Sequence, residues 1–108
     1  MGYAPIIEKA NEHNTAGLAN VSILSSAIAP DIAPCLFRIV VAFSVAGVFK
    51  ATITKAGNTQ TIEFNSGVNL VANSVYMFDL LVHSGDTVNF QYSVNATLLV
   101  LRVSQVVS

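Results

Sequence analysis

Apolar and polar residues alternate along most of the chain from residue 19 onward, with the period of two that places successive side chains of a strand on opposite faces. In residues 35–45, Cys35 and every second residue after it are apolar, whereas the positions between them include Arg38 and Ser44. Similar alternation occurs in residues 19–28, 48–55, 59–65, 75–83, 87–93 and 98–107. The pattern predicts about seven strands in an all-β, antiparallel β-sandwich or small barrel.

The residues between these stretches are typical of turns. Residues 56–59 read Ala-Gly-Asn-Thr, and glycine and asparagine tolerate the positive φ of a tight hairpin loop. Residues 84–86 read Ser-Gly-Asp and predict the turn of a second hairpin. Residues 29–34 contain two prolines, which cannot donate to a strand ladder, so this segment is predicted to be a connection.

The first 18 residues differ from the rest of the chain. They are polar, contain Pro5 and carry Glu8, Lys9 and Glu12. One or two helical turns are possible after Pro5, but no capping residue supports them. We therefore expect an extended N-terminal arm over residues 1–18, followed by a single β-sandwich domain over residues 19–108.

Charge is scarce, and apolar residues are in excess. Charged residues make up 10% of the chain, where about 25% is usual. Residues 35–45, 75–83 and 98–107 are apolar on both strand faces, although a two-layer sandwich has only one inner side. A second copy or a host protein is expected to cover the surplus, since large exposed apolar patches are rare on monomers. The alternative is that edges and loops of the same chain cover it.

Expected contact residues follow from this surplus and from the arm. They are Tyr3, Ile6, Ile7, Leu36, Val40, Met77, Leu81, Leu98 and Val100.

Several classes of partner are not expected. A net charge of −1 without a Lys/Arg cluster argues against nucleic acid. The longest apolar run, residues 33–49, is interrupted by Arg38, Ser44 and Gly47, and it falls short of a membrane-spanning helix. The first 18 residues show no basic start followed by an apolar core, so no secretory signal is expected.

Catalytic chemistry is not indicated either. The six carboxylates are scattered, and no glycine-rich phosphate loop or Cys/His cluster is present. The single cysteine, Cys35, is expected to be a small buried residue. We therefore expect that the protein is not an enzyme and that it binds no small-molecule substrate, metal or cofactor.

Three polar residues have specific structural expectations. Asp79 lies within an apolar strand and is expected to pair with Arg38 or Arg102, because an unpartnered buried charge is costly. Asp86 follows a turn glycine and is expected to accept bonds from local backbone amides, in preference to ligating calcium. His83, at a strand end, is expected to be exposed to water.

Residues 76–93, YMFDLLVHSGDTVNFQYS, combine an aromatic-rich strand, a Gly-Asp turn and a returning Val-Asn-Phe-Gln. This hairpin resembles the closing hairpin of compact jelly rolls of the complement C1q and tumour necrosis factor type, which also form heads, spikes and decoration proteins of viruses and tailed phages. The layout of residues 19–108 is similar to small virion-associated proteins of that kind. The resemblance implies a compact jelly-roll-like sandwich that forms a trimer or other symmetric assembly on a particle surface, with the arm reaching a neighbour.

Two functions from different classes are consistent with these observations. The first is a structural virion protein, a capsid decoration, cement or spike subunit that contacts copies of itself and a capsid or other virion protein. The second is a binding module that recognises a glycan or a host surface through Tyr76, Tyr92, Asn69 and Asn73. With no Trp and only three Tyr, the aromatic platform that a glycan site normally shows is small.

Overall fold

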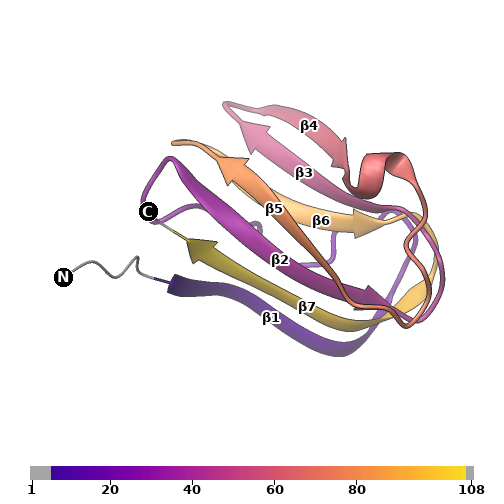
Figure 1. Ribbon diagram of the computed structural model, residues 1–108. Coiled ribbons are helices and arrows are strands. Elements are labelled where there is room, and N and C mark those ends of the chain that lie inside the picture. The colour runs from indigo at the N-terminus through magenta and orange to yellow at the C-terminus, as the bar shows by residue number, and fades with distance from the viewer. Residues whose placement is uncertain (1–5, 107–108) are drawn as a thin grey trace.

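The structure is a computed structural model and describes residues 6–106 of the chain (Figure 1). Seven strands form two antiparallel sheets packed face to face, which confirms the predicted antiparallel β-sandwich. The elements are β1 (Ile6–Gly17), β2 (Cys35–Phe43), β3 (Phe49–Lys55), β4 (Asn58–Glu63), the short 3₁₀ turn η1 (Phe64–Gly67), β5 (Tyr76–Val82), β6 (Thr87–Tyr92) and β7 (Ala96–Val106).

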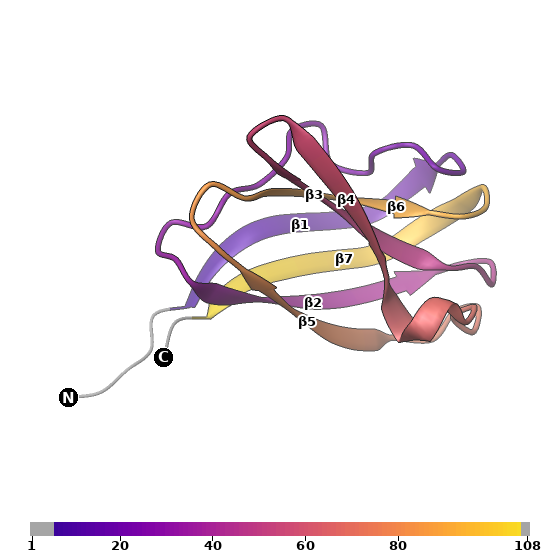
Figure 2. The ribbon, with the colours of Figure 1, turned by 90° about the horizontal axis from the view of Figure 1, so that it is seen from above.

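The two sheets differ in strand number. The four-stranded sheet has the order β1-β7-β2-β5, which Figure 2 shows side by side, and the three-stranded sheet has the order β4-β3-β6. Residues 19–28 run beside β6, where the backbone N–H of Ile23 donates to the carbonyl of Phe90 at 2.8 Å and Ile28 exchanges two bonds with Val88. Although it is not a regular strand, this segment lies at the β6 edge of the second sheet, so the chain crosses between the two layers in a jelly-roll-like order.

Residues 19–28 were predicted to be a strand, and this prediction is wrong. Backbone bonds to β6 occur at residues 20, 23 and 28, which is not the spacing of a regular ladder. The side chain of Asn89 bridges part of the gap: its Oδ1 accepts from Leu24 N–H and its Nδ2 donates to the Leu24 carbonyl, both at 3.0 Å. The amide side chain of Asn89 thus makes the two hydrogen bonds that the backbone of a neighbouring strand would otherwise make.

The N-terminal segment also differs from its prediction. Instead of forming an arm or helical turns, Ile6–Gly17 pairs with β7 from Ile6 opposite Val106 to Gly17 opposite Ala96. It is an edge strand, with a register shift between Glu8 and Ala10 and many exposed side chains, so its apolar alternation is weak. Residues 1–5 of the expected arm lie outside the described residues.

The core lies between the sheets and is rich in aromatic rings. Phe37, Phe49 and Phe90 are fully buried, and the Phe49 ring centroid lies 5.5 Å from that of Phe90 and 5.1 Å from that of Phe64. The inward face predicted for residues 35–43 is confirmed, because Cys35 and every second residue after it are buried.

The alternation in residues 35–45 and 59–65 places Val45 and Ile62 on the apolar, core-facing side of their strands, but both are exposed instead. Val45 is 45% exposed, because β2 ends at Phe43 before reaching it. Ile62 is 37% exposed, because it lies on the edge strand β4, whose residues are all exposed.

The β3–β4 hairpin turns where the sequence predicted. Lys55 pairs with Asn58, and Ala56 (φ 52°) and Gly57 (φ 82°) form the two-residue loop. Both positions of a type I′ loop need positive φ, which explains the glycine. The other loop residue with positive φ is Ala56, whereas Asn58 belongs to β4.

Candidate functional site

The outer face of the four-stranded sheet, the side turned away from the other sheet, carries most of the expected contact residues. In the strand register, Leu36 lies opposite Leu81 on one side and Val106 on the other, and Val40 lies opposite Met77. Met77 and Leu81 are 64% and 54% exposed on the edge strand β5. We call this set the apolar face, and it consists of Leu36, Val40, Met77, Leu81, Val100 and Val106.

An ion pair crosses the apolar face between its two apolar rows. Arg38 lies opposite Asp79, and its Nε and Nη2 donate to the two carboxylate oxygens at 3.0 and 3.2 Å. The predicted pairing of Asp79 with Arg38 is confirmed. The hydrogen bonds between the two side chains lower the pKa of Asp79 and raise the pKa of Arg38. Since both side chains are nearly half exposed, the pair contributes little to stability, although its two charges cancel each other.

The structure brings five of the nine expected contact residues together. Leu36, Val40, Met77, Leu81 and Val100 all belong to the apolar face. Ile7 lies opposite the buried Gln105, so it is on the inner side of the sheet. Tyr3 and the Ile6 side chain lie outside what the structure describes.

Leu98 is not a surface contact, and that expectation is wrong. It is 2% exposed and belongs to the core. The register between β2 and β7 shifts between Ala42, opposite Val100, and Phe43, opposite Leu98. The extra residue in β7 is a bulge, which reverses the face of every side chain beyond it.

Val106 was missed as a member of the apolar face. It completes the row with Leu36 and Leu81. Val106 is an even number of residues away from Val100 and Arg102, so the period of two places all three on one face of the strand, and this signal could have identified it.

The expected glycan residues do not form an exposed platform. Tyr92 is 3% exposed, its ring stacks on Phe43 at a centroid distance of 3.6 Å, and its Oη donates to the Val45 carbonyl at 2.6 Å. Its proposed surface role is therefore wrong. Tyr76 is half-buried, and its Oη accepts from Val71 N–H at 2.9 Å. Asn69 and Asn73 are exposed in the loop that precedes Tyr76.

The outer face of the three-stranded sheet, which we call the polar face, is built from hydroxyl, amide and charged residues. Its cross-strand rows are Gln91–Lys50–Glu63, Asn89–Thr52–Thr61 and Thr87–Thr54–Thr59. Thr54 and Thr59 share a hydrogen bond of 2.9 Å between their hydroxyls. This face has the composition expected of a sheet surface in water.

Asp86, His83 and Cys35 lie in simple local environments, whereas Gln105 is buried and its Nε2 has no hydrogen-bond partner within the described residues. Asp86 accepts from the backbone N–H of His83 at 2.9 Å, as predicted, and the His83 side chain is 59% exposed. Cys35 is buried and unbridged, and burial raises the pKa of its thiol. Among residues 6–106, no three His, Cys, Asp or Glu side chains gather in a way that could hold a metal ion.

Comparison of the chain with protein-family models, curated proteins and solved structures finds no match. Within the described part of the chain, no helix has the length and hydrophobicity needed to cross a membrane.

Proposed function

We propose that the protein is a structural subunit that assembles with copies of itself through the apolar face. The observation that carries this proposal is the exposure of Met77 (64%) and Leu81 (54%) on one edge strand, beside the half-buried Leu36 and Val40. Aliphatic residues and methionine with few charges are typical of the buried centre of an interface.

A second copy is a suitable partner for electrostatic reasons. The net charge of −1 leaves little repulsion between copies. Arg38 and Asp79 on the apolar face neutralise each other, and Arg102, opposite Val40, adds one exposed positive charge on the same side of the sheet. A single additional cation is far fewer than the several that a nucleic-acid surface needs.

The size of the face sets the expected strength of association. The apolar face spans β7, β2 and β5, and three strands spaced about 4.8 Å apart, each rising about 3.3 Å per residue, give an area of about 400 Å² over the length of β2. A standard interface buries about 800 Å² per partner. The apolar face alone is smaller than a standard interface, so we expect weak association that depends on concentration and that other contacts would strengthen.

Sedimentation velocity on the purified chain tests this proposal. Over protein concentrations of about 1 to 500 µM, we expect the mean mass to rise towards a defined oligomer, for which the family resemblance favours a trimer. A species with the mass of one chain at every concentration would contradict the proposal.

We further propose that this assembly belongs to a virion, as a decoration, cement or spike protein that also contacts a capsid protein. The support is the resemblance of the hairpin at residues 76–93, together with the jelly-roll-like strand order. Mass spectrometry of purified particles from the virus or phage whose genome encodes the chain is expected to detect it in many copies per particle. Its absence from such particles would contradict the virion role and leave self-assembly to be judged by sedimentation.

A further inference from the structure

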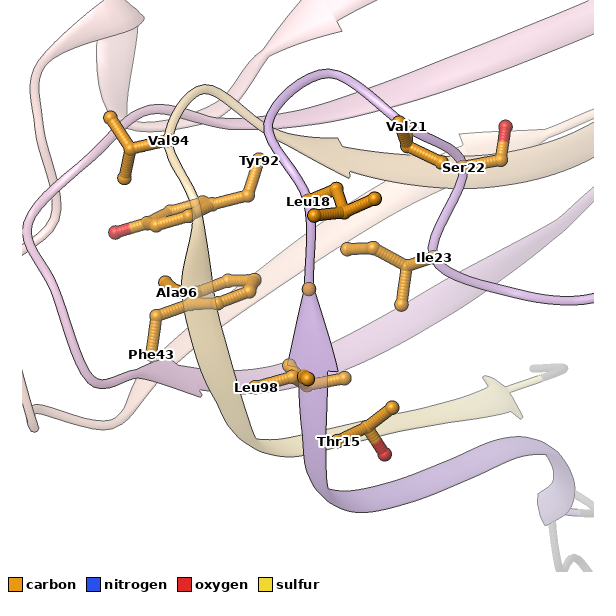
Figure 3. A pocket seen from close by; sticks show the side chains of 12 residues that line it. Thr15, Leu18, Val21, Ser22, Ile23, Phe43, Tyr92, Val94, Ala96 and Leu98 are labelled. Carbon is orange, nitrogen blue, oxygen red and sulfur yellow. The ribbon is translucent and has the colours of Figure 1, made fainter.

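A separate apolar pocket lies at the end of the sandwich where β1, β2 and β6 end and β7 begins. Its volume is about 160 Å³, and its walls come from the end of β1, the segment that follows β1, and the adjoining ends of the other strands. In Figure 3, Leu18, Ile23, Leu98 and Phe43 surround the space. The pocket shares no residue with the apolar face, so it is independent of the proposed assembly.

Aromatic and aliphatic side chains make up most of the pocket wall. Phe43 and Tyr92 lie parallel, at 8° between ring planes, and both are almost fully buried. Leu98 is also buried, whereas Leu18 and Val21, at 65% and 51% exposure, are on its solvent side. The pocket thus has a rigid aromatic and aliphatic interior and an apolar entrance.

Most of the polar groups beside the pocket already have partners. The Tyr92 hydroxyl donates to the Val45 carbonyl at 2.6 Å, and the Thr15 hydroxyl donates to the His13 carbonyl at 3.2 Å. The backbone N–H groups of Asn20 and Ile23 donate to carbonyls of β6. Burial raises the pKa of Tyr92 to about 12, so its ring carries no charge near neutral pH. A polar ligand would lose its hydration here and gain few hydrogen bonds in return.

We propose that this pocket binds a small, uncharged, apolar ligand of about the size of a benzene ring. A cavity of about 150 Å³ lined by aliphatic and aromatic side chains in another protein stays dry and binds benzene, and this pocket has a similar size and lining. The ligand can be a free molecule or the apolar end of a longer one that leaves through the entrance beside Leu18. Aromatic rings and compact alkyl groups are both small, uncharged and apolar, as this pocket requires.

Methyl NMR of the full chain tests the proposal, with benzene as the probe. Titration is expected to shift the methyl signals of Leu18, Ile23 and Leu98 along one saturable curve, with a dissociation constant of about 0.1 to 1 mM. Octanoate tests whether the end of a longer chain enters the same place. Shifts that do not saturate, or that lie away from the pocket, would overturn the proposal.

Two variants separate filling of the pocket from general effects. Ala96→Leu places a larger side chain at a residue that lines the pocket, and it is expected to weaken benzene binding at least about tenfold. Ala46→Leu makes the same change at an exposed position outside the pocket and is expected to leave binding unchanged. If Ala96→Leu does not fold, Leu18→Asp at the exposed entrance provides the test, with weaker binding expected. Benzene binding of wild-type strength in the folded pocket variant would overturn the proposal.

Discussion

The two sheets contribute to one core but present opposite surfaces to the outside. The three-stranded sheet covers its outer side with rows such as Asn89–Thr52–Thr61, whereas the four-stranded sheet exposes Met77 and Leu81. The polar face shows that this sandwich does not need apolar residues on an outer surface in order to fold. The apolar face therefore calls for a reason beyond folding, and burial against another copy supplies one.

The largest expected effect comes from placing charge on the apolar face. The double variant Met77→Lys/Leu81→Lys introduces two cations on β5, on either side of Asp79, where they are compatible with the isolated fold because both positions are exposed. In an assembly the cations would be desolvated, so association is expected to weaken about 100-fold or more. Sedimentation equilibrium measures the change.

The matched control places two lysines on the polar face. Thr59→Lys/Thr61→Lys alters the edge strand β4, where both residues are exposed. Association is expected to stay within about twofold of wild type. Equal weakening by both double variants would show that added charge, and not the apolar face, controls association.

A second prediction concerns Asn89, which lies in the polar face but also holds residues 19–28. Asn89→Ala removes the two bonds to Leu24 and is expected to lower the free energy of unfolding by about 2 kcal/mol. Thr52→Ala, its neighbour in the same row, is expected to change it by less than about 0.5 kcal/mol. Urea denaturation measures both values, and similar losses in the two variants would contradict the role given to Asn89.

A third prediction follows from Tyr92, in the core between the two faces. Its pKa is raised to about 12, mainly by burial, so the folded state disfavours the phenolate. Stability is therefore fully present below pH of about 10, the usual tyrosine pKa, and falls as pH rises towards 12. Tyr92→Phe is expected to reduce this alkaline loss while weakening the fold slightly at neutral pH, because the bond to Val45 disappears.

Thermal melts between neutral and alkaline pH, together with phenolate absorbance, measure this effect. An identical alkaline loss in wild type and Tyr92→Phe would assign the loss to other groups.

The smallest effect is expected at the ion pair on the apolar face. The pKa of Asp79 is lowered by its bonds to Arg38, so the contribution of the pair is present above the ordinary value of 3.8 and is lost as pH falls through the lower folded value. Asp79→Asn is expected to reduce stability slightly near neutral pH and to converge with wild type in acid. Melting temperatures measured from neutral pH to about pH 2 test this, and a gap that persists unchanged in acid would contradict it.

The alternation of residues predicted six of the seven strands and the core side of β2. One face of β2, β3, β5, β6 and β7 is buried in the apolar core, whereas β4 alternates in sequence although all its residues are exposed. The alternation missed β1, because an edge strand with exposed residues such as Glu8 and His13 lacks that contrast. It predicted a strand at residues 19–28, where the bonds from Asn89 replace a ladder, and such substitution leaves no periodic signal.

The candidate interaction residues were predictable to a similar extent. Leu36, Val40, Met77 and Leu81 follow from the period of two alone, since no irregularity interrupts the pairing of β2 with β5. Leu98 was misplaced because a single bulge in β7 reverses the faces. The burial of Tyr92 follows from the period of two in β6, which places it on the side of Val88 and Phe90. The pocket beside it depends on how strand ends converge in space, which local sequence patterns do not encode.

Oxidation of Met77 tests the central claim most directly. Met77 is 64% exposed in the isolated chain and is the only methionine besides Met1. Its rate of conversion to the sulfoxide by dilute peroxide can be followed by peptide mass spectrometry at low and high protein concentration. We predict rapid oxidation in the dilute protein and at least about fivefold slower oxidation where the chain associates. Equal rates at both concentrations, in a sample whose mass shows association, would contradict burial of the apolar face.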